Sequence, residues 1–261
     1  SLASTISEVV NQGTGHTVDT SVAGFNADFA ATNDLSDRLD PGAAAGTNGV
    51  AYFDTLAGAI ANSDNGAVVT VSGNLAGGAI GVDPDNLTVN SSSTSAATLT
   101  LGAANSITLQ GTANYDVVGN AAVNSITGND GANVITGNGG ADIIDGGAGS
   151  DTIYWSIGDG ADSIAGGANG DTFMMADAAG ASRTTILDFD ATNPMERIDL
   201  RAFASVRDID DLDIAVRGGD TVIRIGSDEI VLAGVEPAAL DARSYRAFNL
   251  VIADNRDVLW L

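Results

Sequence analysis

GNGGADIIDGGAGSDTIY (Gly137 to Tyr154) repeats one pattern on a pitch of nine residues. In each half glycines come first, an aspartate stands at the sixth position and an isoleucine at the eighth. Glycine readily adopts the positive φ angles that tight turns between short strands require. An aliphatic side chain at the same point of every step can turn inward and stack on its neighbours. We therefore expect each frame to be a turn followed by a short strand, with two frames completing one coil.

Similar frames surround this stretch. From Gly119 they read GNAAVNSIT, GNDGANVIT, GNGGADIID and GGAGSDTIY, and after Trp155 and Ser156 they continue as IGDGADSIA and GGANGDTFM. The sixth positions hold Asn124, Asn133, Asp142, Asp151, Asp162 and Asp171. Upstream, aliphatic residues such as Leu87 and Ile107 recur at about the spacing of two frames. This rhythm predicts one solenoid from about residue 66 to 176, in which each coil buries its apolar face against the next.

The acid at the sixth position indicates a calcium site. Ca²⁺ binds six to eight oxygens from carboxylates and backbone carbonyls. A glycine-rich turn exposes carbonyls, and each stacked turn supplies half a site. On this pitch Asp142 faces Asp162, and Asp151 faces both Asn133 and Asp171. Without the ion these stacked carboxylates would repel one another.

The candidate ligands share the turn positions of the frames. They are Asp130, Asn133, Gly137, Gly139, Asp142, Gly146, Ala148, Asp151, Asp162, Gly166, Ala168 and Asp171. Because asparagine replaces the acid at 124 and 133, the first two turns should bind weakly or not at all. The two inserted residues after Tyr154 could distort the pairing of Asp142 with Asp162.

The frames match GGxGxDxUx, and the sequence resembles the RTX, or haemolysin-type calcium-binding, family. Downstream, ILDFD, ERIDLRAF and GGDTVIRI are similar to the C-terminal half of the RTX domains of serralysin-type proteases. This resemblance implies a further calcium ligand at Asp188 or Asp190. The final DVLWL, residues 257–261, resembles an uncleaved signal for the type I secretion machinery.

Together these observations predict an all-β fold: a parallel β-helix that continues into a calcium-binding β-roll with a C-terminal β-rich cap. We expect an irregular N-terminal region at 1–50, and metal-free coils with an N-terminal cap at 51–118. The RTX β-roll should occupy 119–177, and the cap and secretion signal 178–261. A short helix is expected within 53–69, and a hairpin over 220–235 with its turn at 226–228.

Composition narrows the partners. The net charge is −24 and all ten basic residues are arginine, so the chain should repel nucleic acid and anionic membranes. No apolar stretch is long enough to insert into a membrane. There is no cysteine and only one histidine, His16, which excludes a disulfide framework and a zinc site with several histidines.

Two functions remain open. The first is a secreted, non-catalytic calcium-binding domain of an extracellular or bacterial cell-surface protein, such as an adhesin or surface-layer protein. It would bind cell-surface polysaccharide or self-assemble. The alternative is an enzyme's accessory module, or a small β-helix lyase or epimerase acting on acidic polysaccharide. Residues 50–118 lack Arg, Lys and His, which disfavours catalysis there; the polar side chains they offer include Tyr52, Asp54, Asp64, Asp83, Asp85 and Tyr115.

Overall fold

The computed structural model describes residues 7–11, 16–18, 50–53, 56–61, 66–71, 79–83, 85–91, 96–156, 160–176, 182–207, 211–236 and 250–252. Within these ranges the chain forms twenty-one strands and one short α-helix, which confirms the predicted all-β fold. It divides into two compact units, Ser1–Asp116 and Val117–Leu261.

The first unit contains coils of parallel strands. Its elements are β1 (Ser7–Asn11), β2 (His16–Val18), β3 (Val50–Phe53), α1 (Leu56–Ala61), β4 (Val68–Val71), β5 (Ala79–Val82), β6 (Leu87–Ser91), β7 (Ala97–Leu101) and β8 (Ser106–Gly111), with the start of β9 (Tyr115–Val118). One sheet has the order β8-β6-β4-β2-β1-β3, and β5 pairs with β7 in the other. Leu87 pairs with Ile107 in parallel register, as the aliphatic spacing predicts. The expected short helix is present as α1.

The N-terminal region departs from the prediction, because β1 and β2 lie within residues expected to be irregular. β1 pairs antiparallel with both β2 and β3, and β2 pairs in parallel with β4. These strands are short and polar, so their sequences carry no apolar alternation. Pairing with distant strands satisfies their backbone groups instead, which a local pattern cannot reveal.

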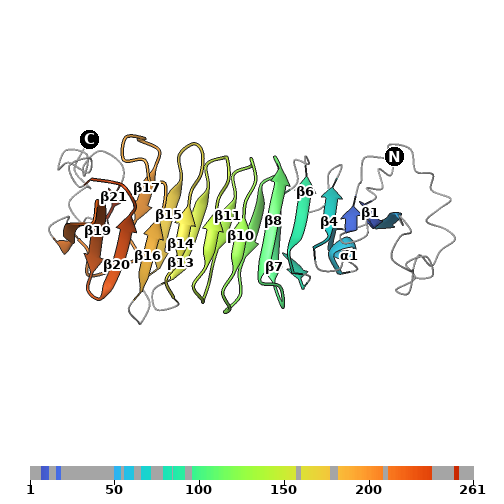
Figure 1. Ribbon diagram of the computed structural model, residues 1–261, viewed down its shortest axis with the longest axis horizontal. Helices are drawn as coiled ribbons and strands as arrows, with labels where there is room; N and C mark the ends of the chain where they lie inside the picture. The colour runs from blue at the N-terminus through green and yellow to red at the C-terminus, as the bar shows by residue number, and fades with distance from the viewer. Residues whose placement is uncertain are drawn as a thin grey trace. The chain divides into compact units, whose positions relative to one another are not determined.

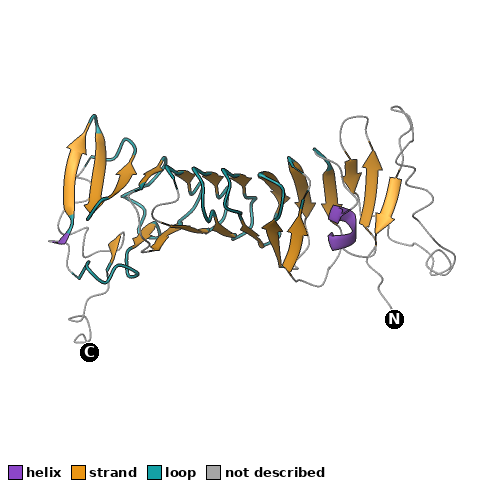
Figure 2. Ribbon diagram, turned by 90° about the horizontal axis from the view of Figure 1, so that it is seen from below, coloured by secondary structure: helices purple, strands orange, loops and turns teal. Residues whose placement is uncertain are grey.

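The second unit contains the nine-residue frames and the cap. Its strands are β10 (Ser125–Thr127), β11 (Val134–Thr136), β12 (Ile143–Asp145), β13 (Thr152–Ser156), β14 (Ser163–Ala165), β15 (Thr172–Ala176), β16 (Arg183–Ile186), β17 (Arg197–Asp199), β18 (Asp213–Arg217), β19 (Asp220–Ile225), β20 (Asp228–Leu232) and β21 (Leu250–Val251). Alternate strands belong to alternate sheets: β10, β12, β14 and β16 stack in one, and β11, β13, β15 and β17 in the other (Figure 1). Seen at 90°, these strands form two layers joined by turns (Figure 2).

The core of the frames is formed by the apolar residue at position eight of each frame. Ile126 pairs with Ile144, and Ile144 with Ile164, in one sheet. Ile135 pairs with Ile153, and Ile153 with Phe173, in the other sheet. All of these side chains are buried. Burial of each is worth roughly 1.5–3 kcal/mol, so every coil is held mainly by the coils on either side of it.

The coils differ in length while their interior register is kept. Along the first sheet, Asn124 and Asp142 at position six are 18 residues apart, whereas Asp142 and Asp162 are 20 residues apart. The inserted Trp155 and Ser156 extend β13 and pair with Met175 and Ala176 of β15. The insertion therefore lengthens two neighbouring strands together and leaves the pairing beside it undistorted.

Parallel stacking continues beyond residue 177. β16 pairs with β14, and β17 with β15, so both columns of strands extend into the C-terminal region. β20 then pairs in parallel with β16 and antiparallel with β19. The predicted hairpin is confirmed, with Ile225 opposite Asp228 and a positive φ of 62° at Gly226. The predicted secretion tail at 257–261 lies outside the described residues.

Candidate calcium site

The position-six side chains lie inside the roll, stacked in two columns. The first column holds Asn124, Asp142 and Asp162, and the second holds Asn133, Asp151 and Asp171. None of the six is more than 4% exposed. Carboxylates are rarely buried without a partner, because removing a charge from water is costly. These columns therefore need compensating groups.

One oxygen of each carboxylate is satisfied by the preceding coil. The backbone N–H of Asp142 donates to Asp162 Oδ1 at 2.9 Å, and that of Asp151 donates to Asp171 Oδ1 at 2.8 Å. Asn133 N–H donates to Asp151 Oδ1 at 2.8 Å in the same way. The structure thus brings together the pairs expected from the pitch, and each acid reaches toward the coil before it.

The second oxygen has no such donor in the second column. Asp151 Oδ2 and Asp171 Oδ2 are fully buried and accept no hydrogen bond. Each lies against the first glycine of its own frame. A Cβ on Gly146 would come within 2.6 Å of Asp151 Oδ2 and 2.5 Å of the Gly166 carbonyl oxygen. The absence of that Cβ leaves a cradle lined by a carboxylate and a carbonyl oxygen, which is the donor chemistry that calcium prefers.

The same pattern marks the other glycines of position one. A Cβ on Gly137 would come within 2.5 Å of Asp142 Oδ2, and one on Gly166 would collide with Asp171 Oδ2. The Gly137 N–H donates to the Tyr154 carbonyl at 3.1 Å, which ties the turn to the following coil. At Gly137, Gly146 and Gly166 a side chain at position one would therefore collide with the inward carboxylate of the same frame.

Burial shifts the titration of the second column. It raises the pKa of Asp151 to about 7, and the charge of Asp171 adds to the rise. Burial also raises the pKa of Asp171 to about 6, with a contribution from Asp188. Near neutral pH an ion-free column is therefore partly protonated. A bound cation would favour the charged forms.

A glutamate beyond the frames extends the second column and was not among the predicted ligands. The N–H of Asp171 donates to Glu196 Oε2 at 3.2 Å, and Glu196 is only 3% exposed. Burial raises its pKa to about 7. The sequence does carry a signal for Glu196. It stands two residues before the buried Ile198, just as the acid at position six of each frame stands two residues before the buried residue at position eight. In the first column Thr184 occupies the corresponding place, 3.5 Å from Asp162 Oδ2.

The turns of the asparagine frames differ from those of the aspartate frames. Asn120 Oδ1 accepts the Ala122 N–H at 2.8 Å, and Asn129 Oδ1 accepts the Gly131 N–H at 2.9 Å, so these turns close on their own side chains. In the later frames the second residue is left-handed instead, with φ of 97° at Gly147 and 96° at Gly167. The first two turns thus close on amide side chains, with no inward acid in their own frames.

The remaining candidate ligands are spread around the turns. Ala148 and Ala168 face each other in a parallel bridge, and the Ala168 carbonyl accepts the Gly149 N–H at 3.2 Å. Gly139 lies next to Ala121 of the preceding coil. Asp130 is exposed at the edge of its turn and is not brought to either column.

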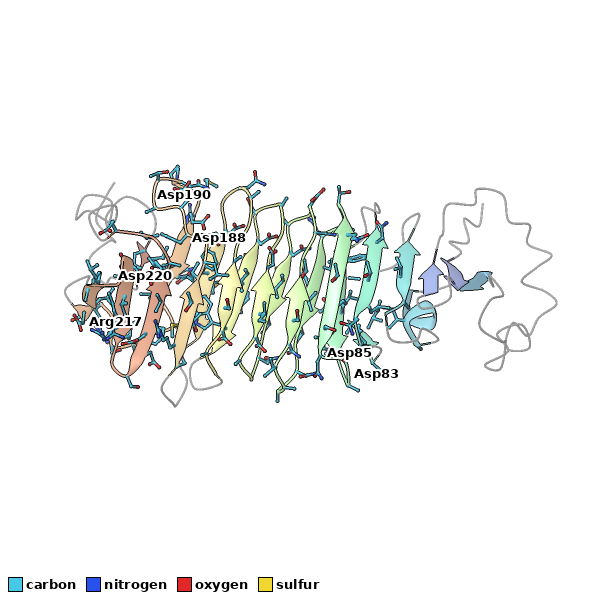
Figure 3. The ribbon with its side chains drawn as sticks, viewed as in Figure 1. Asp83, Asp85, Asp188, Asp190, Arg217 and Asp220 are labelled. Atoms are coloured by element: carbon cyan, nitrogen blue, oxygen red, sulfur yellow. The ribbon has the colours of Figure 1, made fainter. Side chains whose placement is uncertain are left out.

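The two C-terminal candidates have different surroundings (Figure 3). Asp188 accepts the N–H groups of Gly166 and Gly167 at 3.0 and 2.7 Å, so it is attached to a turn of the roll. Asp190 instead accepts the N–H and hydroxyl of Thr192, which lower its pKa. Of the two, only Asp188 contacts the turn beside the second column.

Over the described ranges, no three acidic or histidine side chains converge on a point where they could hold a metal. A site in this roll must therefore combine one or two carboxylates with backbone carbonyls. Such mixed oxygen sets are normal for calcium and unsuited to metals that require nitrogen or sulfur.

The acids considered for catalysis in the first unit hold its coils together. Asp85 Oδ1 accepts the N–H groups of Asn105 and Ser106 at 2.7 and 2.9 Å, and these bonds lower its pKa despite some burial. Asp83 Oδ1 accepts the Ala103 N–H at 3.1 Å. Figure 3 labels both acids. Tyr115 is buried and donates its hydroxyl to Ser91 at 3.2 Å.

Asp54 and Asp64 lie outside the described residues, and Tyr52 lies in β3. No helix within the described residues has the length and apolar character needed to cross a bilayer.

Comparison with known families identifies part of the roll. Residues 118–153 match the family of RTX calcium-binding nonapeptide repeats, over four copies. Repeats of this family bind Ca²⁺, and this segment is a calcium-binding β-roll. The match spans the first four frames and ends at Ile153, before the insertion. No curated protein matches the chain in sequence.

Proposed function

We propose that the calcium-binding repeats make this chain a non-catalytic extracellular module that folds when it meets calcium. The observation that carries the proposal is the pair of buried carboxylate oxygens, Asp151 Oδ2 and Asp171 Oδ2, that accept no hydrogen bond. A buried charge without a partner disfavours folding, and a bound cation removes that penalty. Folding and calcium binding are then one equilibrium.

We assign the ligands to the acid frames. Asp142, Asp151, Asp162 and Asp171 would supply carboxylate oxygens, and glycine turns such as Gly146 and Gly166 would supply carbonyls. Asp188 would contribute at the last turn, where it already contacts the glycine amides. Asn133, Asp130 and Asp190 would add little, since Asn133 carries no charge, Asp130 is not brought to either column, and Asp190 closes its own turn on Thr192.

The export route follows from the same energetics. Extracellular calcium sites bind at about 10⁻⁴–10⁻³ M, so they are empty in the cytosol. Each site stabilises the fold by roughly 1.4 kcal/mol at ten times its Kd. With a net charge of −24 and no cation, the chain would stay loose enough for a type I channel. Outside the cell it would fold and serve as part of an adhesin or surface-layer protein.

The test is a calcium titration of the full chain, followed by far-ultraviolet circular dichroism. We expect a cooperative gain of β signal near millimolar calcium, reversal by EDTA, and no equivalent response to Mg²⁺, which demands a tighter octahedral site. Asp151→Ala should abolish most of the response, whereas Asp130→Ala, which removes an exposed acid, should leave it intact. A chain that is fully folded in EDTA at neutral pH would refute the proposal.

A further inference from the structure

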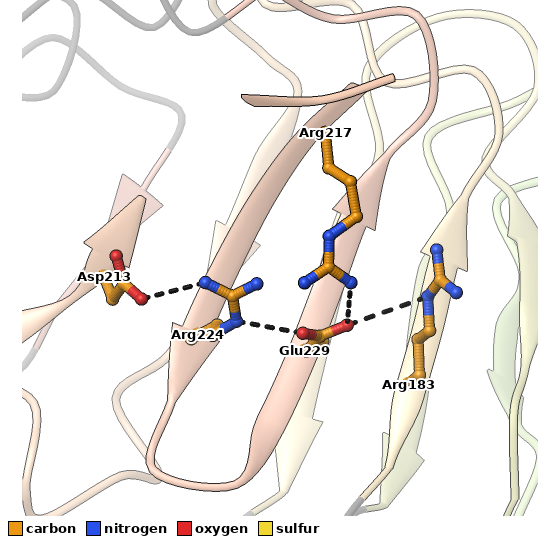
Figure 4. A network of polar contacts seen from close by, with 5 residues as sticks. All are labelled: Arg183, Asp213, Arg217, Arg224 and Glu229. Carbon is orange, nitrogen blue, oxygen red and sulfur yellow. Dashed lines mark hydrogen bonds and ion pairs between the residues drawn. The ribbon is translucent and has the colours of Figure 1, made fainter. Parts of the chain in front are cut away.

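A row of alternating charges crosses four neighbouring strands of the C-terminal sheet (Figure 4). Arg183 of β16 lies opposite Glu229 of β20, and Glu229 lies opposite Arg224 of β19. Arg224 in turn lies opposite Asp213 of β18. Its guanidinium is 2.9 Å from Glu229 Oε1 on one side and 2.9 Å from Asp213 Oδ2 on the other. Each charge between the ends thus has an opposite charge on both sides.

The row stops at Asp213 because β18 is the last strand of that sheet among the described residues. The Asp213 side chain is 68% exposed and contacts a cation only on its inner side. An edge strand also presents unpaired backbone N–H and C=O groups, which can pair with another strand. Val216, on the same strand, is an apolar side chain with 58% exposure.

The sequence of β18 is complementary to itself when two copies run antiparallel. It reads Asp213-Ile-Ala-Val-Arg217, with an acid at one end and a base at the other. With Ala215 at the centre, Asp213 would lie opposite the partner's Arg217, and Ile214 opposite the partner's Val216. Opposite charges and apolar pairs at directly facing positions both stabilise antiparallel strands.

We propose that β18 pairs with β18 of a second copy of this chain about a twofold axis at Ala215. The partner's Arg217 would then continue the row of alternating charges beyond Asp213. In the single chain Arg217 is 56% exposed and contacts Glu229 at 3.5 Å, so in the dimer its guanidinium would exchange this long contact for the partner's Asp213. Such an interface is isologous: the same patch serves both copies.

This dimer goes beyond calcium-driven folding and uses none of the position-six residues. One strand pair is a small contact, so the association should be weak and dependent on concentration. Crowding of many copies at one surface would favour it. The chain would then be linked through its C-terminal sheet while its turns remain free.

Cysteine cross-linking tests the register. The chain has no cysteine, so a single introduced thiol can pair only with its own counterpart. Facing Cα atoms in antiparallel strands are about 4.5–5.5 Å apart, which a disulfide can bridge. Under mild oxidation in millimolar calcium, Ala215→Cys should form a covalent dimer. The matched control Val216→Cys should form far less, because position 216 faces position 214. Equal cross-linking of both variants, or none of Ala215→Cys, would overturn the proposal.

Sedimentation of the full chain tests the charges. The apparent mass should rise from 26.1 kDa toward twice that value between ~10 µM and ~1 mM. Asp213→Arg and Arg217→Asp should each weaken self-association at least about tenfold, since each places like charges opposite one another twice. Mixed in equal amounts, these two variants should associate again, because the two bases on the strand of one variant would face the two acids on the strand of the other.

Val216→Lys should also keep the chain monomeric, whereas Val123→Lys, at 57% exposure on a turn of the roll, should not. Circular dichroism of every variant confirms that the fold is intact. A wild-type chain that stays monomeric throughout, or variants that do not recover on mixing, would refute the pairing.

Discussion

Replacing Asp151 by asparagine should stabilise the calcium-free protein and weaken its response to calcium. The substitution keeps the shape of the side chain and removes its charge. The chain itself shows that the amide fits, because Asn133 occupies the preceding place in the same column at 1% exposure. The new Oδ1 can still accept the Asn133 N–H, as Asp151 does at 2.8 Å.

The magnitude follows from the titration of Asp151. Burial raises its pKa from 3.8 to about 7, and each unit corresponds to about 1.36 kcal/mol. Above pH 7 the folded chain must therefore hold an ionised carboxylate at a cost of about 4 kcal/mol relative to the unfolded chain. Because the folded pKa is the higher one, this cost is absent below pH 4 and grows as the pH rises to 7. Asp151→Asn removes it, so the gain should be about 4 kcal/mol at pH 8 and should vanish near pH 4.

The assay is urea unfolding of the full chain, followed by circular dichroism and by tryptophan fluorescence. Trp155 is buried between coils and should report the roll directly. Each protein is measured at pH 4 and pH 8, in millimolar calcium and in EDTA. In EDTA at pH 8 wild type should be largely unfolded before urea is added, and the variant should retain more β signal. Asp130→Asn is the control, because it removes one exposed charge outside the columns.

Two results would contradict this reasoning. If Asp151→Asn is less stable than wild type in EDTA at pH 8, the carboxylate has a favourable partner in the ion-free fold. If the variant gains as much from calcium as wild type does, Asp151 is not a ligand. Stabilisation in EDTA together with a reduced calcium response is the expected combination.

Three further outcomes are expected. Calcium affinity should rise between about pH 5 and pH 8 and then level off, because Asp151 and Asp171 must lose protons to bind the ion. Calorimetry in buffers of different ionisation enthalpy should detect the protons released. Gly146→Ala should destabilise the protein by about 1–3 kcal/mol in thermal unfolding, because the added Cβ would meet the Gly166 carbonyl oxygen and Asp151 Oδ2. Gly81→Ala is the control and should be tolerated, because its Cβ would meet nothing within 4 Å. Asp85→Ala should lower stability by about 1 kcal/mol equally with and without calcium, and a change in breakdown of a uronate polymer would show that this acid acts in catalysis instead.

The sequence was sufficient for the roll because its pattern is strictly periodic. The position-eight aliphatics fix which side of each strand is buried, and the pitch fixes which frames stack. The pairing of Asp151 with Asp171 follows from these two facts alone. What the pitch could not reveal is that only one oxygen of Asp151 and of Asp171 would find a hydrogen-bond donor, since this depends on the angle at which the side chain enters the coil.

Other features escaped prediction for physical reasons. Glu196 repeats the acid-x-aliphatic signature, but it lies outside a nine-residue frame and is preceded by no glycine turn. β1 and β2 depend on partners far away in the sequence. Asp188 and Asp190 look equivalent in sequence, and only the fold shows that one contacts the glycine amides while the other closes its own turn.

The steady lengthening of the coils has a practical consequence. The step between successive column residues grows from 18 to 20, and then to 22 at Thr184 and 25 at Glu196, while the interior register is unchanged. Additional residues therefore enter at the ends of strands and leave the buried columns as they were. The junctions after Ser156 and after Ala176 are accordingly natural grafting points. A foreign peptide placed there would be displayed on a scaffold whose rigidity could be switched by the calcium concentration.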